Sequence, residues 1–291
     1  MNFTGSIVAI ITPFRNGKVD EQALRDLIDW QIANGTDGIV PCGTSGESAT
    51  LSYDEHNCVI EMTVEAVKGR VPVIAGTGSN STEEAIALTR HAKDVGADGA
   101  LLISPYYNKP TQEGLFLHHR AIAEAVDLPQ VLYNIPGRTA VNVTPQTVAR
   151  LSKIKNIVGI KEGSGSVQQV SDIVHLCSDR FTVLAGDDAL TLPMLAVGAK
   201  GVITVTANVA PADMAGMIDA WVAGDPIKAR QLHYKLYPLF QALFLETNPI
   251  PVKQAVALMG KATPELRLPL CAMSQENLDK LTQVMKDLRL I

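Results

Sequence analysis

The stretch Gly35-Thr36-Asp37-Gly38-Ile39-Val40 (GTDGIV) joins an amphipathic segment to an apolar run, and the same kind of joint occurs twice more. Residues 96–99 (GADG) and 198–201 (GAKG) also stand between a helical pattern and an apolar run. Glycine at the first position permits the left-handed end of a helix, and glycine at the last position permits a tight turn. Each joint therefore predicts the end of a helix and the start of a strand.

Short apolar runs of this kind are spread along the chain, with helical patterns between them. The runs are continuous rather than alternating, which is typical of parallel strands that are covered on both faces. Eight strands that alternate with helices over about 220 residues predict an α/β fold, a (β/α)8 TIM barrel. An open, doubly wound sheet is the competing fold. The predicted strands are residues 7–11, 38–40, 71–75, 100–103, 130–133, 157–160, 181–184 and 201–205.

The strand pattern stops after Gly224, whereas helical patterns continue to the end of the sequence. Asp225-Pro226 has the residue types of a helix N-terminus. We therefore predict a barrel over residues 1–224 and an all-helical C-terminal extension over residues 225–291. A late apolar stripe in this extension consists of Leu278, Leu281, Met285 and Leu288.

The composition is that of a globular protein: of 291 residues, 46% are hydrophobic and 19% are charged. The formal net charge is −5 and the pI is about 5.7, so the sequence predicts no nucleic-acid surface. No apolar run approaches the roughly 18 residues that a membrane span needs. The N-terminal sequence lacks the pattern of a signal peptide, and we therefore expect a cytoplasmic protein.

Several motifs that could bind a metal or a cofactor fail on inspection. The four cysteines lie far apart and form no metal-binding spacing, which predicts reduced, structural cysteines. His118 and His119 are adjacent in a helical pattern and face different directions, so they are not expected to share a metal ion. Gly76-Thr77-Gly78 opens like a dinucleotide-binding loop, but Ser81 stands in place of the third glycine.

The apolar run IVGI at residues 157–160 ends abruptly in Lys161, Glu162 and two glycines. Lys161 could simply mark the point where a strand leaves the core. An amine held against an apolar wall loses its proton more easily, so Lys161 is also a candidate nucleophile. In a TIM barrel the residues that follow the strands meet at one rim, which is where active sites lie.

Chemically useful side chains follow several other predicted strands. Thr44 and Ser45 stand between glycines and either form a plain turn or offer hydroxyl and N–H groups to a carboxylate. Tyr133 is either a packing aromatic or a proton donor. Arg138 is either a surface charge or an anion ligand. Asp187-Asp188 fits a helix cap better than an acid–base pair. The convergence of these groups favours the nucleophile interpretation of Lys161.

Three motifs carry a family resemblance. GTSGE at residues 43–47, YNIPGRT at 133–139 and GIKE at 159–162 resemble the dihydrodipicolinate synthase family of class I aldolase-type barrels. The similarity runs almost end to end and includes GSIVAIITPF, PYYNKPTQEG, GVITVTAN and NPIPVK. It implies a lyase of lysine and diaminopimelate biosynthesis that condenses pyruvate with L-aspartate 4-semialdehyde and needs no metal or organic cofactor.

The resemblance also implies roles for individual residues. Lys161 would form a Schiff base with pyruvate, and Tyr133 would transfer protons. The usual family assembly is a homotetramer built as a dimer of dimers. Thr44 and Ser45 would bind the pyruvate carboxylate. Thr44 would also link Tyr133 to Tyr107, which would reach in from a neighbouring subunit, to complete the proton relay. The remaining implied site residues are Arg138, for the aspartate semialdehyde carboxylate, and Gly186 and Ile203, at the border of the site.

Two departures from the family pattern are visible. Gly163 stands where relatives usually have a small residue with a side chain, which is expected to loosen that turn. Tyr53 replaces a histidine that is often found in the allosteric site of lysine-inhibited relatives, so we hypothesise weak or absent feedback by lysine. The residues that match this allosteric site are Ser48, Ala49, His56, Asn80, Glu84 and Tyr106.

Other functions remain open from the residues alone. N-acetylneuraminate lyase and sugar-acid aldolases share the lysine and the tyrosine with this family. Arg138 favours the synthase, because a short second substrate with a carboxylate needs a cation near pyruvate. A catalytically inactive barrel that senses a metabolite is disfavoured, because Lys161, Tyr133, Thr44 and Arg138 occur together.

Overall fold

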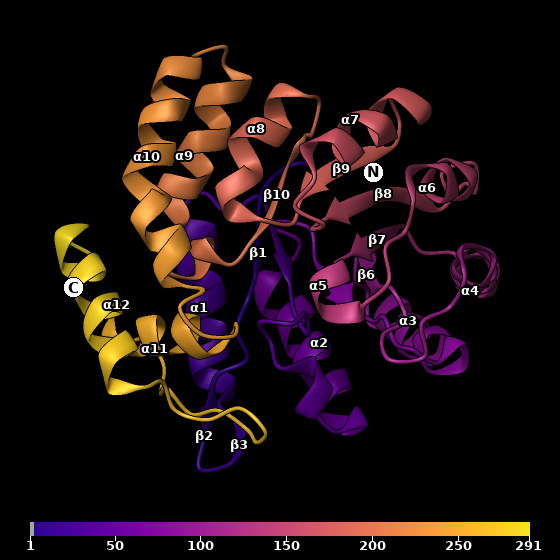
Figure 1. Cartoon of the computed structure of the whole chain (residues 1–291). Coiled ribbons are helices and arrows are strands. Elements are labelled where there is room, and N and C mark those ends of the chain that lie inside the picture. The colour runs from indigo at the N-terminus through magenta and orange to yellow at the C-terminus, as the bar shows by residue number, and fades with distance from the viewer. Residues whose placement is uncertain (1–2) are drawn as a thin grey trace. The chain divides into compact units, whose positions relative to one another are not determined.

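The computed structural model describes residues 3–291, and Figure 1 shows their helices and strands. These residues form two compact units. The first unit consists of residues 3–4 and Pro72–Ile203, and the second consists of Gly5–Val71 and Thr204–Ile291. The proposed division of the chain at residue 224 stays a prediction.

The first unit contains a parallel sheet with the order β10-β9-β8-β7-β6-β5. Each strand pairs with the next strand of the chain, and helices connect them, which is the repeated β-α connection that the glycine joints predict. The strand residues are buried almost throughout, as continuous apolar runs require. The elements are β5 (Ile74–Gly76), α3 (Thr82–Asp94), β6 (Gly99–Ile103), α4 (Gln112–Ala125), β7 (Gln130–Asn134), α5 (Pro136–Thr139), α6 (Pro145–Leu151), β8 (Ile157–Glu162), α7 (Val167–Leu176), β9 (Thr182–Ala185), a 3-10 turn (Asp188–Leu190), α8 (Thr191–Ala196) and β10 (Gly201–Thr204), whose last residue belongs to the second unit.

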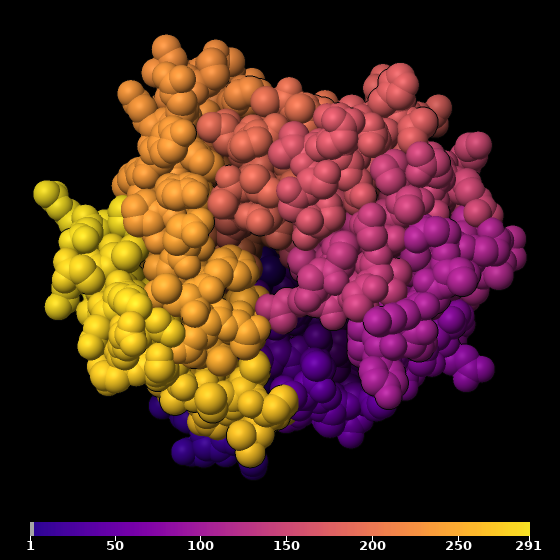
Figure 2. Space-filling view, in the orientation of Figure 1, coloured from indigo at the N-terminus to yellow at the C-terminus, as the bar shows by residue number. Residues whose placement is uncertain are grey.

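The second unit joins the start of the chain to its end. Strands β1 and β4 pair in parallel, with Val8 opposite Ile39. Helix α1 packs against α2, and α9 packs against α10. In the space-filling view the C-terminal residues, in yellow, lie against the orange helices of the same unit, where α12 contacts α10 (Figure 2). The elements are β1 (Gly5–Ala9), β2 (Phe14–Arg15), β3 (Lys18–Val19), α1 (Glu21–Ala33), β4 (Gly38–Val40), a 3-10 turn (Ser48–Thr50), α2 (Tyr53–Val67), a second 3-10 turn (Thr206–Asn208), α9 (Pro211–Val222), α10 (Pro226–Ala242), α11 (Ile250–Leu258) and α12 (Gln275–Asp287).

All eight predicted strands are present within residues 3–291, and their alternation with helices is that of a (β/α)8 barrel followed by helices. The boundaries differ at several ends. Strand β8 continues through Glu162, so Lys161 lies inside the strand rather than just after it. The pair β2–β3 was not expected, because strands of two residues are too short to show a period in the sequence.

The helix ends follow the predicted capping residues. Asp225 accepts a hydrogen bond from the backbone N–H of Lys228 and precedes Pro226 at the first helical position. Asp187 accepts a hydrogen bond from the N–H of Ala189, which confirms its predicted role as a cap. Across residues 3–291 no helix combines the length and the apolar character that crossing a membrane requires.

Candidate active site

The side chain of Lys161 is buried beside the ring of Tyr133. The two residues are opposite each other in the register of β7 and β8. The Lys161 Nζ lies 4.2 Å from the centroid of the Tyr133 ring, and Lys161 is only 5% exposed. The structure therefore excludes the interpretation of Lys161 as a residue that leads the chain into solvent. A buried amine next to a phenol is typical of a lysine nucleophile.

The neighbouring acid, Glu162, has a structural role. Successive side chains of a strand point to opposite faces, so Glu162 faces away from the side that carries Lys161. Its carboxylate accepts hydrogen bonds from Asn134 Nδ2 at 3.0 Å, Gln169 Nε2 at 3.0 Å and the backbone N–H of Ser164 at 2.7 Å. This network joins the ends of β7 and β8 to α7. The sequence shows the acid but does not reveal these partners.

Two further predicted residues belong to the same unit: Gly186 directly follows β9, and Ile203 lies in β10. The backbone N–H of Gly186 donates to the carbonyl of Glu162 at 2.7 Å, so the chain after β9 stays close to the end of β8. A side chain at Gly186 would lie within 3.0 Å of backbone atoms of Glu162 and Gly163. Ile203 is buried in β10, which pairs with β9. The structure therefore places the ends of β7, β8, β9 and β10 side by side.

Gly163, which departs from the family pattern, lies in a narrow space. A Cβ atom there would be 3.0 Å from Cδ1 of Ile135 and 3.1 Å from the carbonyl oxygen of Asn134. Both contacts are tighter than ordinary van der Waals distances. Packing after β7 therefore favours glycine at this position, and the turn is held by the hydrogen bond from the Gly163 N–H to the Asn134 carbonyl at 2.8 Å.

Arg138 and Tyr107 lie at the surface of the first unit. Arg138 belongs to the single turn α5, which begins directly after β7, and its side chain is exposed. Tyr107 is 91% exposed and has a φ of 72°, in the left-handed region that side chains rarely adopt. The rest of the chain therefore leaves the Tyr107 side chain almost uncovered.

Thr44 and Ser45 belong to the second unit, in a tight turn that follows β4. The N–H of Gly46 donates to the Gly43 carbonyl at 3.1 Å, and the N–H of Glu47 donates to the Thr44 carbonyl at 3.2 Å. The hydroxyl oxygen of Ser45 accepts a hydrogen bond from Asn248 Nδ2 at 3.1 Å. Asn248 belongs to the NPIPVK stretch, and no local pattern predicts a role for it.

The residues that match an allosteric lysine site are divided between the two units. In the first unit, Asn80 Nδ2 donates to the carbonyl of Tyr106 at 3.2 Å, and the Glu84 carboxylate accepts from the Ser79 hydroxyl at 2.7 Å. In the second unit, Ser48 and Ala49 form a 3-10 turn, and His56 is buried in α2. Tyr53, at the start of α2, is 57% exposed.

The two adjacent histidines of α4 are both buried. The Thr82 hydroxyl lies 2.9 Å from Nδ1 of His118, and the His118 and His119 rings meet edge to face. Burial lowers the pKa of His118 to about 4. Burial, together with the neighbouring His118, lowers the pKa of His119 well below its ordinary value. Within residues 3–291 no group of three His, Cys, Asp or Glu side chains is arranged to hold a metal ion.

This burial predicts a loss of stability in acid. The unfolded chain binds a proton at His118 below about pH 6.5, whereas the folded chain binds it only near pH 4. Stability that is present above pH 6.5 is therefore lost as the pH falls towards 4. We expect His118→Gln to reduce the difference in unfolding free energy between pH 7.5 and pH 5 by about 2 kcal/mol. Urea unfolding at both pH values measures this, and an unchanged difference would show that His118 does not titrate in this range.

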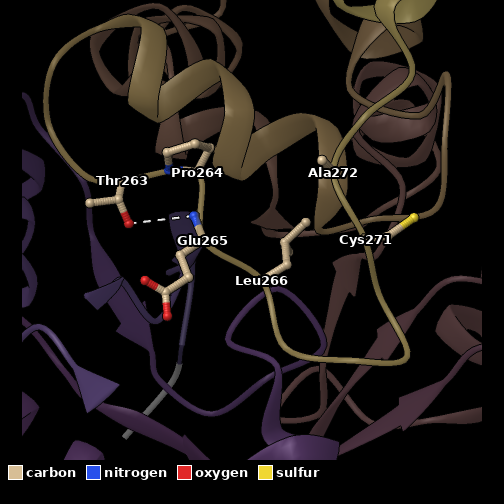
Figure 3. Close-up of a pocket in the computed structure, with 6 residues that line it drawn as sticks. All are labelled: Thr263, Pro264, Glu265, Leu266, Cys271 and Ala272. Atoms are coloured by element: carbon tan, nitrogen blue, oxygen red, sulfur yellow. Dashed lines mark hydrogen bonds between the residues drawn. The ribbon is translucent and has the colours of Figure 1, made fainter. Parts of the chain in front are cut away.

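A pocket of about 440 Å³ in the second unit is not the candidate active site. The Glu265 carboxylate accepts from the backbone N–H groups of Asn16 and Gly17, at 2.9 and 2.5 Å, so it ties this segment to the β2–β3 turn. None of the predicted site residues lines the pocket. Figure 3 shows the residues that line it, which are Thr263, Pro264, Glu265, Leu266, Cys271 and Ala272.

Comparison with known proteins gives one consistent family. The sequence model of the Dihydrodipicolinate synthetase family matches residues 2–288. The 4-hydroxy-tetrahydrodipicolinate synthase of Geotalea uraniireducens is 63% identical over 289 residues, which cover 99% of this chain and 100% of that protein.

Solved structures agree with this assignment. The crystal structure of dihydrodipicolinate synthase from Aquifex aeolicus has a TM-score of 0.98 and 52% identity, over 99% of both chains. The enzyme of Acinetobacter baumannii complexed with pyruvate has a TM-score of 0.97 and 47% identity, over 99% of both chains. The enzyme of Cyanidioschyzon merolae with lysine bound has a TM-score of 0.97 and 42% identity, over 100% of both chains.

The predicted fold class, a (β/α)8 barrel with a C-terminal helical extension, is confirmed by this similarity. Both the length of the match and the level of identity exceed what a shared fold alone requires. The chain belongs to the dihydrodipicolinate synthetase family.

Proposed function

We propose that this chain is a lyase that condenses pyruvate with L-aspartate 4-semialdehyde to 4-hydroxy-tetrahydrodipicolinate, in the pathway to diaminopimelate and lysine. The observation that carries the proposal is the burial of Lys161 against the Tyr133 ring. The chain that holds this pair is 63% identical to the 4-hydroxy-tetrahydrodipicolinate synthase of Geotalea uraniireducens. The pyruvate complex of a relative supports the choice of the first substrate.

The proposed reaction begins at Lys161. Its neutral amine attacks the keto carbon of pyruvate, and loss of water leaves a protonated imine. The imine draws electrons from the methyl carbon, which loses a proton and becomes an enamine. The enamine carbon attacks the aldehyde of the second substrate, and the aldehyde oxygen takes a proton. The amino group of that substrate then displaces Lys161 from the imine carbon and closes the ring.

Tyr133 is proposed to move the protons of these steps. A phenol beside a cationic imine can donate and accept a proton at modest cost, and its ring already lies 4.2 Å from the Lys161 nitrogen. Thr44 and Tyr107 are proposed to extend this relay, and Thr44 and Ser45 to bind the pyruvate carboxylate. Gly186 and Ile203 are proposed to border the substrate. The chemistry requires no metal ion or organic cofactor.

Arg138 is proposed to bind the carboxylate of aspartate semialdehyde. Its guanidinium can make two parallel hydrogen bonds to a carboxylate, and it is carried by the turn directly after β7. We expect Arg138→Ala to raise the KM for aspartate semialdehyde by about 10- to 100-fold and to leave the KM for pyruvate within about twofold. Steady-state kinetics with each substrate varied in turn measures this. A larger effect on pyruvate than on the semialdehyde would contradict the assignment.

N-acetylneuraminate lyase and sugar-acid aldolases are the alternative, because they would use the same lysine and tyrosine. The discriminating experiment supplies the purified protein with pyruvate and aspartate semialdehyde in one assay and with N-acetylneuraminate in another. The proposal predicts turnover only in the first assay. Cleavage of N-acetylneuraminate without condensation of the semialdehyde would replace the synthase by the lyase.

The proposed assembly is a homotetramer in the cytoplasm, built as a dimer of dimers. The 91% exposure of Tyr107 supports this, because an aromatic ring that its own chain leaves uncovered can enter the site of a neighbouring subunit. Sedimentation of the purified protein gives the size of the assembly.

Lysine is proposed as a weak effector. A relative has been solved with lysine bound, and Ser48, Ala49, His56, Asn80, Glu84 and Tyr106 are proposed to form the corresponding site. The exposed phenol of Tyr53 stands where a histidine is often found. We expect weak or absent inhibition by lysine, and stronger inhibition in Tyr53→His. A titration of activity with lysine measures both, and a low-micromolar inhibition constant for the unaltered protein would contradict this expectation.

A further inference from the structure

A buried ion pair connects the C-terminal segment to the Gly43-Thr44-Ser45-Gly46-Glu47 turn, which we call the GTSGE turn. Lys253 of α11 is fully buried, and its Nζ donates to Glu47 Oε1 at 2.6 Å. The side chain of Glu47 is 1% exposed. Two charges are removed from water only where each has a partner, so this pair fixes the end of the turn.

The surroundings hold Glu47 in one orientation. Its second carboxylate oxygen accepts from the backbone N–H of Arg267 at 3.1 Å. Lys253 and Arg267 both lie against the ring of Phe14, with the Lys253 nitrogen 4.1 Å and the Arg267 guanidinium carbon 4.4 Å from its centroid. Glu47 itself has a φ of 52°. A residue with a side chain rarely adopts this backbone conformation, so the surrounding contacts must maintain it.

A second contact from the same segment reaches the hydroxyl of Ser45. Asn248 Nδ2 donates to Ser45 Oγ at 3.1 Å, and Ser45 is 1% exposed. A serine hydroxyl has one proton to donate. Because the oxygen already accepts from an amide, that proton is left for a different acceptor. A hydroxyl that accepts a hydrogen bond is also polarised into a better donor, which suits a carboxylate ligand.

We propose that Asn248 and Lys253 are positioning residues for pyruvate. Lys253 fixes the GTSGE turn through Glu47, and Asn248 directs the Ser45 hydroxyl towards the pyruvate carboxylate. This inference rests on the proposed function, and it gives the helical C-terminal segment a role in the active site: the segment acts through the turn and does not itself touch the substrate.

The test measures how much pyruvate is needed to trap half of the protein as a borohydride-reduced adduct, which requires only imine formation. Asn248→Ala and Ser45→Ala are each expected to raise this concentration about tenfold. The double variant should be no worse than Ser45→Ala alone, because Asn248 acts through Ser45. Asn277→Ala, which removes another side-chain amide from the same segment, is the matched control and should leave the concentration unchanged.

Asn248→Asp separates positioning from a purely structural contact. The aspartate would accept the Ser45 proton, so the tie between the two residues would survive while the hydroxyl pointed away from the ligand. We expect this variant to bind pyruvate less well than Asn248→Ala. Recovery of normal trapping in Asn248→Asp, or additive effects in the Ser45 and Asn248 double variant, would overturn the role of Asn248.

Lys253 is tested in the double variant Glu47→Gln with Lys253→Met, since this leaves no buried charge without a partner. We expect a folded protein that needs about tenfold more pyruvate for half-trapping. Normal trapping in this variant would overturn the role of Lys253. Absence of any adduct in the unaltered protein would instead overturn the proposed function, and this inference with it.

Discussion

Replacement of Lys161 by alanine is expected to lower kcat for condensation by about a thousandfold or more, because no other group can form the imine. Lys161→Arg should lose the same activity. Arginine is of similar length but stays protonated at every accessible pH, so it cannot act as a nucleophile. A comparable loss in both variants assigns the effect to the amine rather than to the length of the side chain.

Lys155→Ala is the matched control, because Lys155 is an exposed lysine just before β8. Its activity should stay within about twofold of the unaltered protein, as is usual for exposed positions away from a site. Circular dichroism establishes that each variant is folded. A folded Lys161→Ala protein with normal activity would contradict the mechanism.

Replacement of Lys253 by methionine is expected to lower the free energy of unfolding by about 3–5 kcal/mol. Methionine has a similar length but leaves the Glu47 carboxylate buried without its cationic partner. Burial lowers the pKa of Lys253, and the Glu47 carboxylate opposes that shift. The carboxylate therefore stabilises the charged form of the buried Lys253 amine. Urea unfolding followed by fluorescence or circular dichroism measures the change.

Lys235→Met provides the comparison for an exposed pair. Lys235 Nζ lies 2.7 Å from Asp213 Oδ2, but its side chain is 48% exposed, so its loss should cost less than about 1 kcal/mol. The double variant Glu47→Gln with Lys253→Met should recover most of the stability lost in Lys253→Met. Equal stability of Lys253→Met and the unaltered protein would show that Glu47 is not held as a buried charge.

The fold could be predicted from the sequence because its signals are local. Glycine pairs such as Gly35 and Gly38 mark the helix-to-strand joints, and continuous apolar runs mark buried parallel strands. The candidate nucleophile was also visible, because Lys161 interrupts such a run. The structure adds that the strand continues through Glu162, which sets the two side chains on opposite faces.

The supporting contacts could not be predicted in this way. Glu47 and Lys253 are 206 residues apart in the chain, and Ser45 and Asn248 are 203 apart. No local period or spacing connects such positions, and only packing shows that they meet. The roles proposed for Thr44, Ser45 and Arg138 therefore rest on the family resemblance, and the Ser45→Ala and Arg138→Ala variants described above test two of them.

The most direct test of the central claim is to incubate the protein with pyruvate, reduce it with borohydride and locate the added mass by peptide mass spectrometry. The account predicts one pyruvate-derived adduct per chain, on Lys161. An adduct on another lysine, or none at saturating pyruvate, would contradict it.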